Sequence, residues 1–483
     1  MGVISWLCYT IVMAQTFFFY DLETSGLNPR QDRIMQFAGQ RTDMNLEPIG
    51  DPYNLLVTLN DDTLPSPDAL MVTGITPQKT VEEGYTEAQF ARMLSEEIFT
   101  PETVAVGFNN IRFDDEFIRH LLWRNFHDPY EWSWKDGRSR WDLLDVVRLT
   151  RALRPEGINW PLDDKGEPSN RLELITSANG IAHENAHDAL ADVTALIAVT
   201  KLIKQKQPQL YDYLLKMRDK KVVQQLVNVD DKKPFVYASG RYDKEFAKTT
   251  VAFPLTTSRN GGVVVYDLRY DPMPFVDLSA DELAAKIFAT WEQRQAEDFV
   301  SLPVKELQYN RCPAVAPLGV LEQGDGWQKI SLDLETVQKH QNILLNHPDF
   351  AEKLRSIFEN KPAFKKLPDP EAQLYDGFLN DCDRIRVEAV RNADERELAD
   401  FHPEFQDERL APLLLHYKAR NFPRSLSEDD LAQWEAWRAQ HLQAQLPGFM
   451  TALHRLVPTA TDEQQFILQE LQLWAEAVLP GSD

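Results

Sequence analysis

The sequence predicts three domains in the order mixed α/β, β-rich and all-helical. Up to about residue 205, short apolar strands alternate with segments whose apolar residues recur at helical spacing. Between residues 235 and 303, short β-prone runs are separated by Gly and Asp turns. Beyond about residue 362, the apolar residues follow the helical period of about 3.6 residues. A chain of 483 residues is also long enough for about three domains.

The first domain is expected to begin with a strand over residues 16–20 that stops at Asp21. A second strand over residues 34–40 follows a Gly- and Pro-containing turn, so the two strands predict a hairpin. A third strand is predicted over residues 104–108. The spacing of apolar residues predicts helices over residues 115–124, 141–153 and 186–204.

In the second domain, we expect a strand over residues 263–268 and a helix over residues 280–295. In the third domain, helices are predicted over residues 410–417, 431–446 and 462–479. Trp434, Trp437 and Trp474 lie at the spacing of a helix core and are expected to be packing residues. The predicted boundaries are an unstructured extension over residues 1–15, the α/β domain over 16–205, the β-rich domain over 206–360 and the helical domain over 361–483.

Residues 3–13 form an apolar run that is similar to the core of a signal peptide, but no Lys or Arg precedes it. The run is also too short to span a bilayer. We therefore expect an unstructured extension and no membrane association.

Hydrophobic residues make up 43% of the chain and charged residues 26%, which is typical of a soluble globular protein. The formal net charge of −24 argues against nucleic-acid binding by the surface as a whole, so a nucleic-acid partner would need a local basic groove. Cys8, Cys312 and Cys382 lie far apart without a CxxC spacing. Neither a disulfide framework nor a zinc site is indicated, and a reducing cytoplasm fits this pattern.

Two carboxylates, Asp21 and Glu23, lie two residues apart at the end of the first predicted strand, so their side chains point to the same face. Two acids on one face repel each other unless a cation lies between them. Hard oxygen ligands of this kind suit Mg²⁺ or Mn²⁺. Taken alone, the pair is explained better by an acidic strand end that meets solvent.

Three further residues add to this pair. Asp114 lies at a predicted strand-to-helix junction, and His187 and Asp192 lie in a predicted helix that has Asn185 as its N-cap. A single histidine in this place would more often be a cap or surface residue. It becomes informative because it completes a set of four acids and one histidine.

The order and separation of Asp21, Glu23, Asp114, His187 and Asp192 resemble those of the DEDDh exonuclease superfamily. The resemblance implies a ribonuclease H-like fold and phosphodiester hydrolysis with two Mg²⁺ ions, for which Mn²⁺ can substitute. The four acids would hold the metal ions, with Asp21 bridging both. His187 would accept the proton of the attacking water, a role that suits a side chain titrating near neutral pH.

Several longer strings resemble bacterial exodeoxyribonuclease I, from about residue 16 to the C-terminus. They are TGITP (73–77), NIRFDD (110–115), SRWDLLD (139–145), LRPEGINW (153–160), AQLYDGF (372–378) and YKARNFP (417–423). This resemblance implies an exonuclease domain joined to an SH3-like domain and a helical domain, which together close around single-stranded DNA. It also implies processive 3′→5′ release of 5′-mononucleotides in DNA repair or recombination. Leu22 departs from the aromatic residue expected between the metal-binding pair, a change that concerns packing beside the site.

Arginines are interleaved with aromatic residues in the first domain, and cations on the backbone with rings under the bases are how proteins hold a single strand. The candidates are Arg112, Arg119, Tyr130, Trp132, Trp134, Arg138, Arg140, Trp141 and Arg148. A buried aromatic cluster with ion-paired arginines explains any one of them equally well. By resemblance, Arg171 would contact the terminal nucleotide, and Glu23 would also bind the substrate. The lysines between residues 201 and 221 could follow phosphates or form a solvated helix face.

Two alternative functions remain open. An RNA-trimming or proofreading relative would carry the same five site residues, but such enzymes need little beyond the first domain. A catalytically idle single-strand binding module would be expected to have lost a site residue, and none is lost.

The exodeoxyribonuclease resemblance also implies a partner, the single-stranded DNA-binding protein, whose acidic C-terminal tail would dock in a basic pocket. Arg154 and Tyr213 are candidate members of that pocket. Glu322 places an acid where a base is expected. A three-domain protein of this kind can act as a monomer.

Overall fold

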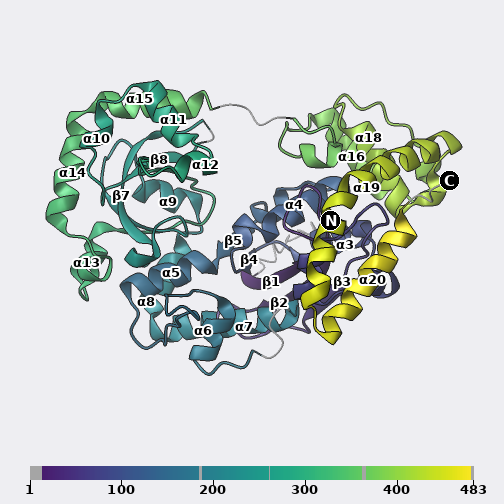
Figure 1. The fold of residues 1–483 in the computed structure, drawn as a ribbon, viewed down its shortest axis with the longest axis horizontal. Helices are drawn as coiled ribbons and strands as arrows, with labels where there is room; N and C mark the ends of the chain where they lie inside the picture. The colour runs from purple at the N-terminus through teal and green to yellow at the C-terminus, as the bar shows by residue number, and fades with distance from the viewer. Residues whose placement is uncertain (1–13, 184–187, 260, 362–365, 480–483) are drawn as a thin grey trace, which may run out of the picture.

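The computed structural model describes residues 14–183, 188–259, 261–361 and 366–479. An N-terminal α/β domain lies between a β-rich domain and a C-terminal helical domain (Figure 1). The predicted domain order is confirmed. Most of the predicted extension (residues 1–13), together with Asn185 and the candidate base His187, lies outside the described residues.

The N-terminal domain is built on a mixed sheet in the order β3-β2-β1-β4-β5. Its strands are β1 (Thr16–Thr24), β2 (Ile34–Thr42), β3 (Tyr53–Leu56), β4 (Thr103–Gly107) and β5 (Ser139–Asp142). Strand β1 is antiparallel to β2, which confirms the predicted hairpin, and parallel to β4. The predicted end of β1 at Asp21 is wrong, because β2 pairs with it as far as Thr24.

The helices of this domain are α1 (Pro67–Thr73), α2 (Pro77–Glu83), α3 (Glu87–Met93), α4 (Asp114–Arg124), α5 (Leu143–Leu153), α6 (Leu172–Ala178), α7 (Ala189–Lys206) and α8 (Pro208–Lys216). The predicted helix start at Trp141 is wrong, because residues 139–142 pair with β4. Helix α5 begins only at Leu143, after Asp142, whose side chain caps it by accepting from the Leu144 N–H. We group α8 with this domain because it packs against α5 and α7.

Alternate side chains of β1 enter two different cores, as the pleat of a strand requires. Phe17 and Phe19 lie in the core that includes α7. Phe18, Tyr20 and Leu22 lie in the opposite core, which includes α3 and α4. Continuing this alternation, Asp21 and Glu23 share the face of Phe17 and Phe19.

The β-rich domain contains an antiparallel sheet in the order β10-β6-β7-β8-β9. Its elements are α9 (Lys220–Leu226), β6 (Phe235–Ala238), β7 (Thr249–Thr257), β8 (Val263–Asp267), α10 (Met273–Val276), α11 (Ala280–Ile287), α12 (Trp291–Arg294), β9 (Val304–Leu307), β10 (Ala314–Pro317), α13 (Gly326–Lys329), α14 (Leu334–Asn346) and α15 (Pro348–Glu359). The single helix predicted over residues 280–295 is wrong. The structure has α11 and α12 instead, because Thr290 starts a new helix with its own capping box.

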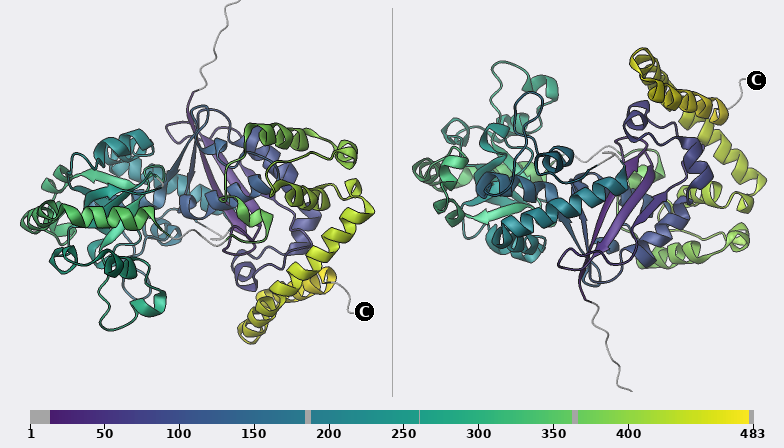
Figure 2. Two further views of the ribbon diagram at one scale, coloured as in Figure 1. Left: turned by 90° about the horizontal axis from the view of Figure 1, so that it is seen from above. Right: turned by 90° about the horizontal axis from the view of Figure 1, so that it is seen from below.

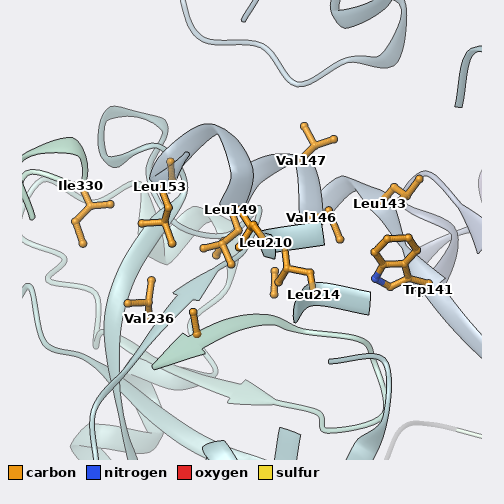
Figure 3. Close-up of a cluster of buried hydrophobic side chains, with 14 of the residues drawn as sticks. Trp141, Leu143, Val146, Val147, Leu149, Leu153, Leu210, Leu214, Val236 and Ile330 are labelled. Atoms are coloured by element: carbon orange, nitrogen blue, oxygen red, sulfur yellow. The ribbon is translucent and has the colours of Figure 1, made fainter. Parts of the chain in front are cut away.

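The junction between the N-terminal and β-rich domains is apolar. A buried cluster runs from α5 and α8 into the β-rich domain, where it includes Val236 and Ile330 (Figure 3). Burial of apolar side chains from both domains fixes them against each other.

The C-terminal domain consists of α16 (Asp381–Asn392), α17 (Glu395–Asp400), α18 (Leu410–Asn421), α19 (Glu428–Leu456) and α20 (Asp462–Val478). Helices α19 and α20 lie on the side of the N-terminal domain away from the β-rich domain (Figure 2). Trp434 and Trp474 are buried, as predicted for packing residues, and the Trp474 indole donates to the Thr63 carbonyl at 2.9 Å. Among the described residues, no helix is long and apolar enough to cross a membrane.

A buried network of charges joins the C-terminal domain to the N-terminal domain. Glu371 accepts hydrogen bonds from Arg33 at 2.9 Å and from His416 at 2.8 Å, and it pairs with Arg420 at 2.6 Å. Arg420 also pairs with Asp62 at 2.6 Å. Burial alone would raise the pKa of Asp62, but the guanidinium groups of Arg420 and Arg33 hold it at about 2. The network therefore consists of ionised groups that compensate each other.

Removing one charge from this network is predicted to destabilise the protein strongly. In Glu371→Gln, Arg33 and Arg420 lose a buried counter-charge, which is expected to cost about 3–5 kcal/mol in the free energy of unfolding. Urea denaturation of the full chain measures this change. The control is Glu131→Gln, which removes an exposed pair with Lys135 and should cost less than about 1 kcal/mol. Equal effects of the two substitutions would contradict a structural role for the network.

Candidate metal centre

Strand β1 holds the first two acids of the site. Asp21 pairs with Ala38 of β2 and Glu23 with Gln36, so ladder hydrogen bonds fix the backbone of both acids. Leu22 lies between them but points into the opposite core, where it is 5% exposed. The departure at Leu22 therefore affects packing on the far side of the strand from the carboxylates.

Helix α7 brings Asp192 to this pair. Its N-cap is Asp188, whose side chain accepts from the N–H groups of Leu190 and Ala191. The predicted N-cap at Asn185 is therefore wrong, because the helix begins at Ala189. In this first turn, Asp192 places a carboxylate oxygen within 4.8 Å of oxygens from Asp21 and Glu23.

Asp114 reaches the same cluster from the start of α4. It is buried, and the backbone N–H of Leu22 hydrogen-bonds to it, which ties it to β1. The charge of Asp114 raises the pKa of both Asp21 and Glu23, so the fourth acid also faces the pair. The structure thus brings together all four acids that the sequence singled out.

The four carboxylates repel one another in a site that is largely shielded from solvent. Burial, followed by the charges of Asp192 and Asp114, raises the pKa of Glu23 to about 8. Burial, followed by the charge of Asp115, raises the pKa of Asp114 to about 8. The pKa of Asp21 is raised well above its usual range by burial and then by Asp114, Glu23 and Asp192. Ionising all four acids near neutral pH therefore requires compensating positive charge.

His183 is a member of the site that the sequence did not reveal. Its Nε2 atom lies 2.6 Å from Oδ1 of Asp192, and its Nδ1 atom lies 3.1 Å from Oγ1 of Thr176. The imidazole orients the Asp192 carboxylate from outside the cluster. The spacing between His183 and Asp192 fits no motif recognised in the sequence. The presence of a second histidine four residues before His187 was the signal that could have pointed to it.

A second group, Asp369, Glu371 and His416, also has ligand atoms within 4.8 Å of one another. There, Glu371 is already paired with Arg33 and Arg420. The two guanidinium groups already neutralise the negative charge of this group, so it does not need a metal ion for charge compensation. In the cluster around Asp21, no Arg or Lys is among the causes that shift the pKa of Asp21, Glu23 or Asp114.

The candidate strand-contacting residues form separate groups with different partners. Arg119 pairs with Glu116 at 2.9 Å and lies over the ring of Tyr130. Arg112 and Arg148 both pair with Asp145, at 3.0 Å and 2.5 Å. The most exposed candidates are Trp134 and Arg171.

Four other candidates are buried or hydrogen-bonded within the N-terminal domain. Trp132 and Trp141 are 5% and 1% exposed and pack in the two cores of the N-terminal domain. Arg140 is buried and pairs with Asp115, and Arg138 donates to the Phe99 carbonyl at 2.6 Å. For Trp132, Trp141 and Arg140, burial favours the aromatic-cluster interpretation over strand contact.

Two residues of the C-terminal domain join the Arg119 group. The Tyr375 hydroxyl accepts from Arg119 at 3.4 Å and donates to Glu116 at 2.5 Å. Phe378 is 83% exposed, with its ring centroid 6.0 Å from that of Tyr130. The sequence located the string that contains both residues but gave no sign that it lies beside Tyr130.

Comparison with known families identifies each domain. Residues 18–200 match the model described as Exonuclease. Residues 218–360 match the Exonuclease I SH3-like domain, and residues 368–478 match the Exonuclease I C-terminal domain.

Whole proteins of the same kind are similar along nearly the full chain. Exodeoxyribonuclease I of Haemophilus influenzae is 40% identical over 94% of this chain and 97% of that protein. Exodeoxyribonuclease I of Escherichia coli is 39% identical over 96% of this chain and 97% of that protein.

Solved structures agree with this. Exonuclease I from Methylocaldum szegediense, 40% identical, superposes with a TM-score of 0.92 over 97% of this chain and all of that one. E. coli exonuclease I in complex with a dA16 oligonucleotide, 39% identical, superposes with a TM-score of 0.92 over 96% of this chain and all of that one. The chain belongs to the exodeoxyribonuclease I family.

Proposed function

We propose that this protein removes 5′-mononucleotides from the 3′ end of single-stranded DNA, using two divalent metal ions. The convergence of Asp21, Glu23, Asp114 and Asp192 at one end of β1 carries the proposal. The similarity to an exonuclease I that was solved with a dA16 oligonucleotide supports the choice of single-stranded DNA as substrate.

The donor set fits Mg²⁺, with Mn²⁺ able to substitute. All four side chains offer hard carboxylate oxygens, and their raised pKa values fit a site completed by cations. Asp21 would contact both ions, and Glu23, Asp114 and Asp192 would complete their shells. Bound ions supply charge stabilisation for the attacking and leaving oxygens of the phosphodiester.

The remaining groups of this chain orient the reactants and move the proton. His187 takes the proton from the attacking water, as its place in the set implies. His183 holds the Asp192 carboxylate from outside the cluster, at 2.6 Å. Arg171 and Glu23 contact the terminal nucleotide.

The rest of the strand follows cations and rings outside the cluster. Arg119, Tyr130, Tyr375 and Phe378 offer a guanidinium and three rings at the junction with the C-terminal domain. Such a group suits phosphate contact and base stacking without sequence preference. Arg112 and Arg148, toward the β-rich domain, and the exposed Trp134 are further contacts. A lined path of this kind explains how a protein of net charge −24 can hold DNA.

We further propose a monomeric protein that acts in the cytoplasm in DNA repair or recombination. We propose that it binds the single-stranded DNA-binding protein, and that the acidic C-terminal tail of that partner makes the contact. The Arg154 side chain donates to the Val320 carbonyl at 3.3 Å, so this arginine contacts the β-rich domain. Tyr213 lies in the cluster shared by the two domains. Glu322 accepts from the Trp327 indole at 3.2 Å, so this acid has a structural partner.

The substrate class is tested with single-stranded DNA, duplex DNA and RNA of one length, each with Mg²⁺ and with EDTA. We expect mononucleotide release from single-stranded DNA with Mg²⁺ and none with EDTA, because the carboxylate cluster cannot act without cations. Chromatography of the products measures release. Faster degradation of RNA would favour the RNA-trimming alternative, and DNA binding without any degradation would favour the idle binding module.

Asp114→Asn tests the site itself. Loss of one metal-holding carboxylate is expected to remove several kcal/mol of transition-state stabilisation, which corresponds to a rate loss on the order of 10³-fold. Single-turnover degradation measures the rate, and fluorescence anisotropy measures DNA binding, which should persist. Asp349→Asn, which changes a 63% exposed side chain in the β-rich domain, is the charge-matched control and should keep the wild-type rate. An unchanged rate in Asp114→Asn would contradict the assignment of Asp114 as a metal ligand.

The raised pKa values predict that stabilisation by metal grows with pH. Without metal, the folded protein keeps protons on Glu23 and Asp114 up to about pH 8, whereas the unfolded chain releases them near pH 4. The metal-free site therefore costs stability as pH rises through this window, and a cation offsets that cost. Differential scanning fluorimetry should give a larger Mn²⁺-induced rise in Tm at pH 8.5 than at pH 6. An equal rise at both pH values, or the same pH dependence in Asp114→Asn, would contradict the prediction.

A further inference from the structure

Asp115 is a buried carboxylate next to the metal-centre residue Asp114, and its hydrogen-bond partners lie outside the cluster of four acids. It is 0% exposed, and its two oxygens are held by three different elements. Oδ1 accepts from the hydroxyl of Tyr20 and from the side-chain amide of Asn110 at 3.2 Å. Oδ2 accepts from Nη1 of Arg140 at 2.5 Å.

These bonds tie together β1 and α4, two of the three elements that carry the metal-centre acids. Tyr20 directly precedes Asp21 on β1, and Asp115 directly follows Asp114 on α4. Asn110 reinforces the link because its amide also donates to the Tyr20 hydroxyl, at 3.2 Å. A shift of α4 along β1 would therefore have to break the contacts of Asp115 before Asp114 could move relative to Asp21.

Arg140 extends the same link to the β-rich domain. It lies on β5, the edge strand of the sheet nearest that domain (Figure 1). While Nη1 holds Asp115, Nη2 donates to the Asn310 carbonyl at 2.9 Å. The thiol of Cys312 in turn donates to the Arg140 carbonyl at 3.0 Å. The segment before β10 thus contacts the arginine at its guanidinium and at its backbone.

We propose that Asp115 and Arg140 are positioning residues, which set Asp114 against the acids of β1 and make that placement depend on the seating of the β-rich domain. Because Asp115 is 0% and Arg140 7% exposed, we assign neither residue to contact with the substrate or the metal ions. This inference rests on the proposed metal site. It adds that the β-rich domain acts on the metal centre through a direct chain of contacts: Asn310, Arg140, Asp115, Asp114.

A purely structural role is the competing explanation, because breaking any buried ion pair destabilises a protein. The chain offers a matched comparison in Glu87 and Arg124. Their side chains are 2% and 1% exposed and pair at 2.8 Å, but they lie in the junction with the C-terminal domain. Glu87→Gln should therefore lower stability without changing metal binding.

The test measures Mn²⁺ affinity of the full chain by calorimetry, together with the Mg²⁺ concentration that half-saturates degradation of single-stranded DNA. In Asp115→Asn, we expect both values to weaken by about 10–100-fold, as is typical when partners that orient metal ligands are lost. The rate at saturating metal should recover toward wild type. Arg140→Lys should also weaken binding, because one ammonium group cannot hold both Asp115 and Asn310. The effect should be smaller than in Asp115→Asn, because the lysine keeps a positive charge beside Asp115.

Tyr20→Phe removes only one hydroxyl from the link and keeps the protein testable if Asp115→Asn does not fold. It should shift the half-saturating Mg²⁺ concentration in the same direction by a smaller factor. Wild-type metal affinity in both Asp115→Asn and Tyr20→Phe would overturn the inference, as would an equal shift in Glu87→Gln. If the wild-type chain itself bound no Mn²⁺, the proposed metal site would fail and this inference with it.

Discussion

The mutual repulsion of four carboxylates at one end of β1 is the constraint around which the molecule is organised. Asp21 and Glu23 come from one strand, Asp114 from α4 and Asp192 from α7, so the cluster exists only when three elements pack correctly. Burial and neighbouring charges raise the pKa of each of the first three. Such an arrangement is unfavourable as a structural core, and it is explained by the cations that a nuclease of this family would use.

The surrounding domains are attached to this centre by different kinds of interaction. The β-rich domain shares an apolar core with α5 and α8, and Arg140 reaches across that junction to Asn310. The C-terminal domain is joined through apolar clusters and through the ionised network around Glu371. Two kinds of interaction therefore hold the three domains around one sheet. The buried charges need precise partners, whereas the apolar surfaces need only complementary shape.

Much of this architecture could be predicted from the sequence, because hydrophobic periodicity and acid spacing are local signals. The hairpin of β1 and β2, the helix that carries Asp114 and the helical C-terminal domain were all predicted, and the four acids do meet. Errors arose where tertiary pairing overrides local pattern. Trp141 continues an apolar helical stripe but belongs to a strand, because β4 offers it a ladder of hydrogen bonds.

Contacts between distant segments were beyond sequence reasoning. Nothing local to Tyr375 or Phe378 indicates that they lie beside Arg119 and Tyr130. The pattern of arginines interleaved with aromatic residues does not distinguish two environments. Arg119 is proposed to face a nucleic-acid strand, whereas Arg140 faces a buried acid. Burial decides that question, and burial depends on the whole fold.

The proposed function depends on two metal ions that the carboxylate cluster holds when single-stranded DNA is bound. Anomalous diffraction from crystals grown with Mn²⁺ and a single-stranded oligonucleotide tests it most directly. We expect two anomalous peaks in the cluster, both in contact with Asp21, with Glu23, Asp114 and Asp192 as the remaining protein ligands. Fewer than two peaks in the cluster, or Mn²⁺ held by other residues in its place, would contradict it.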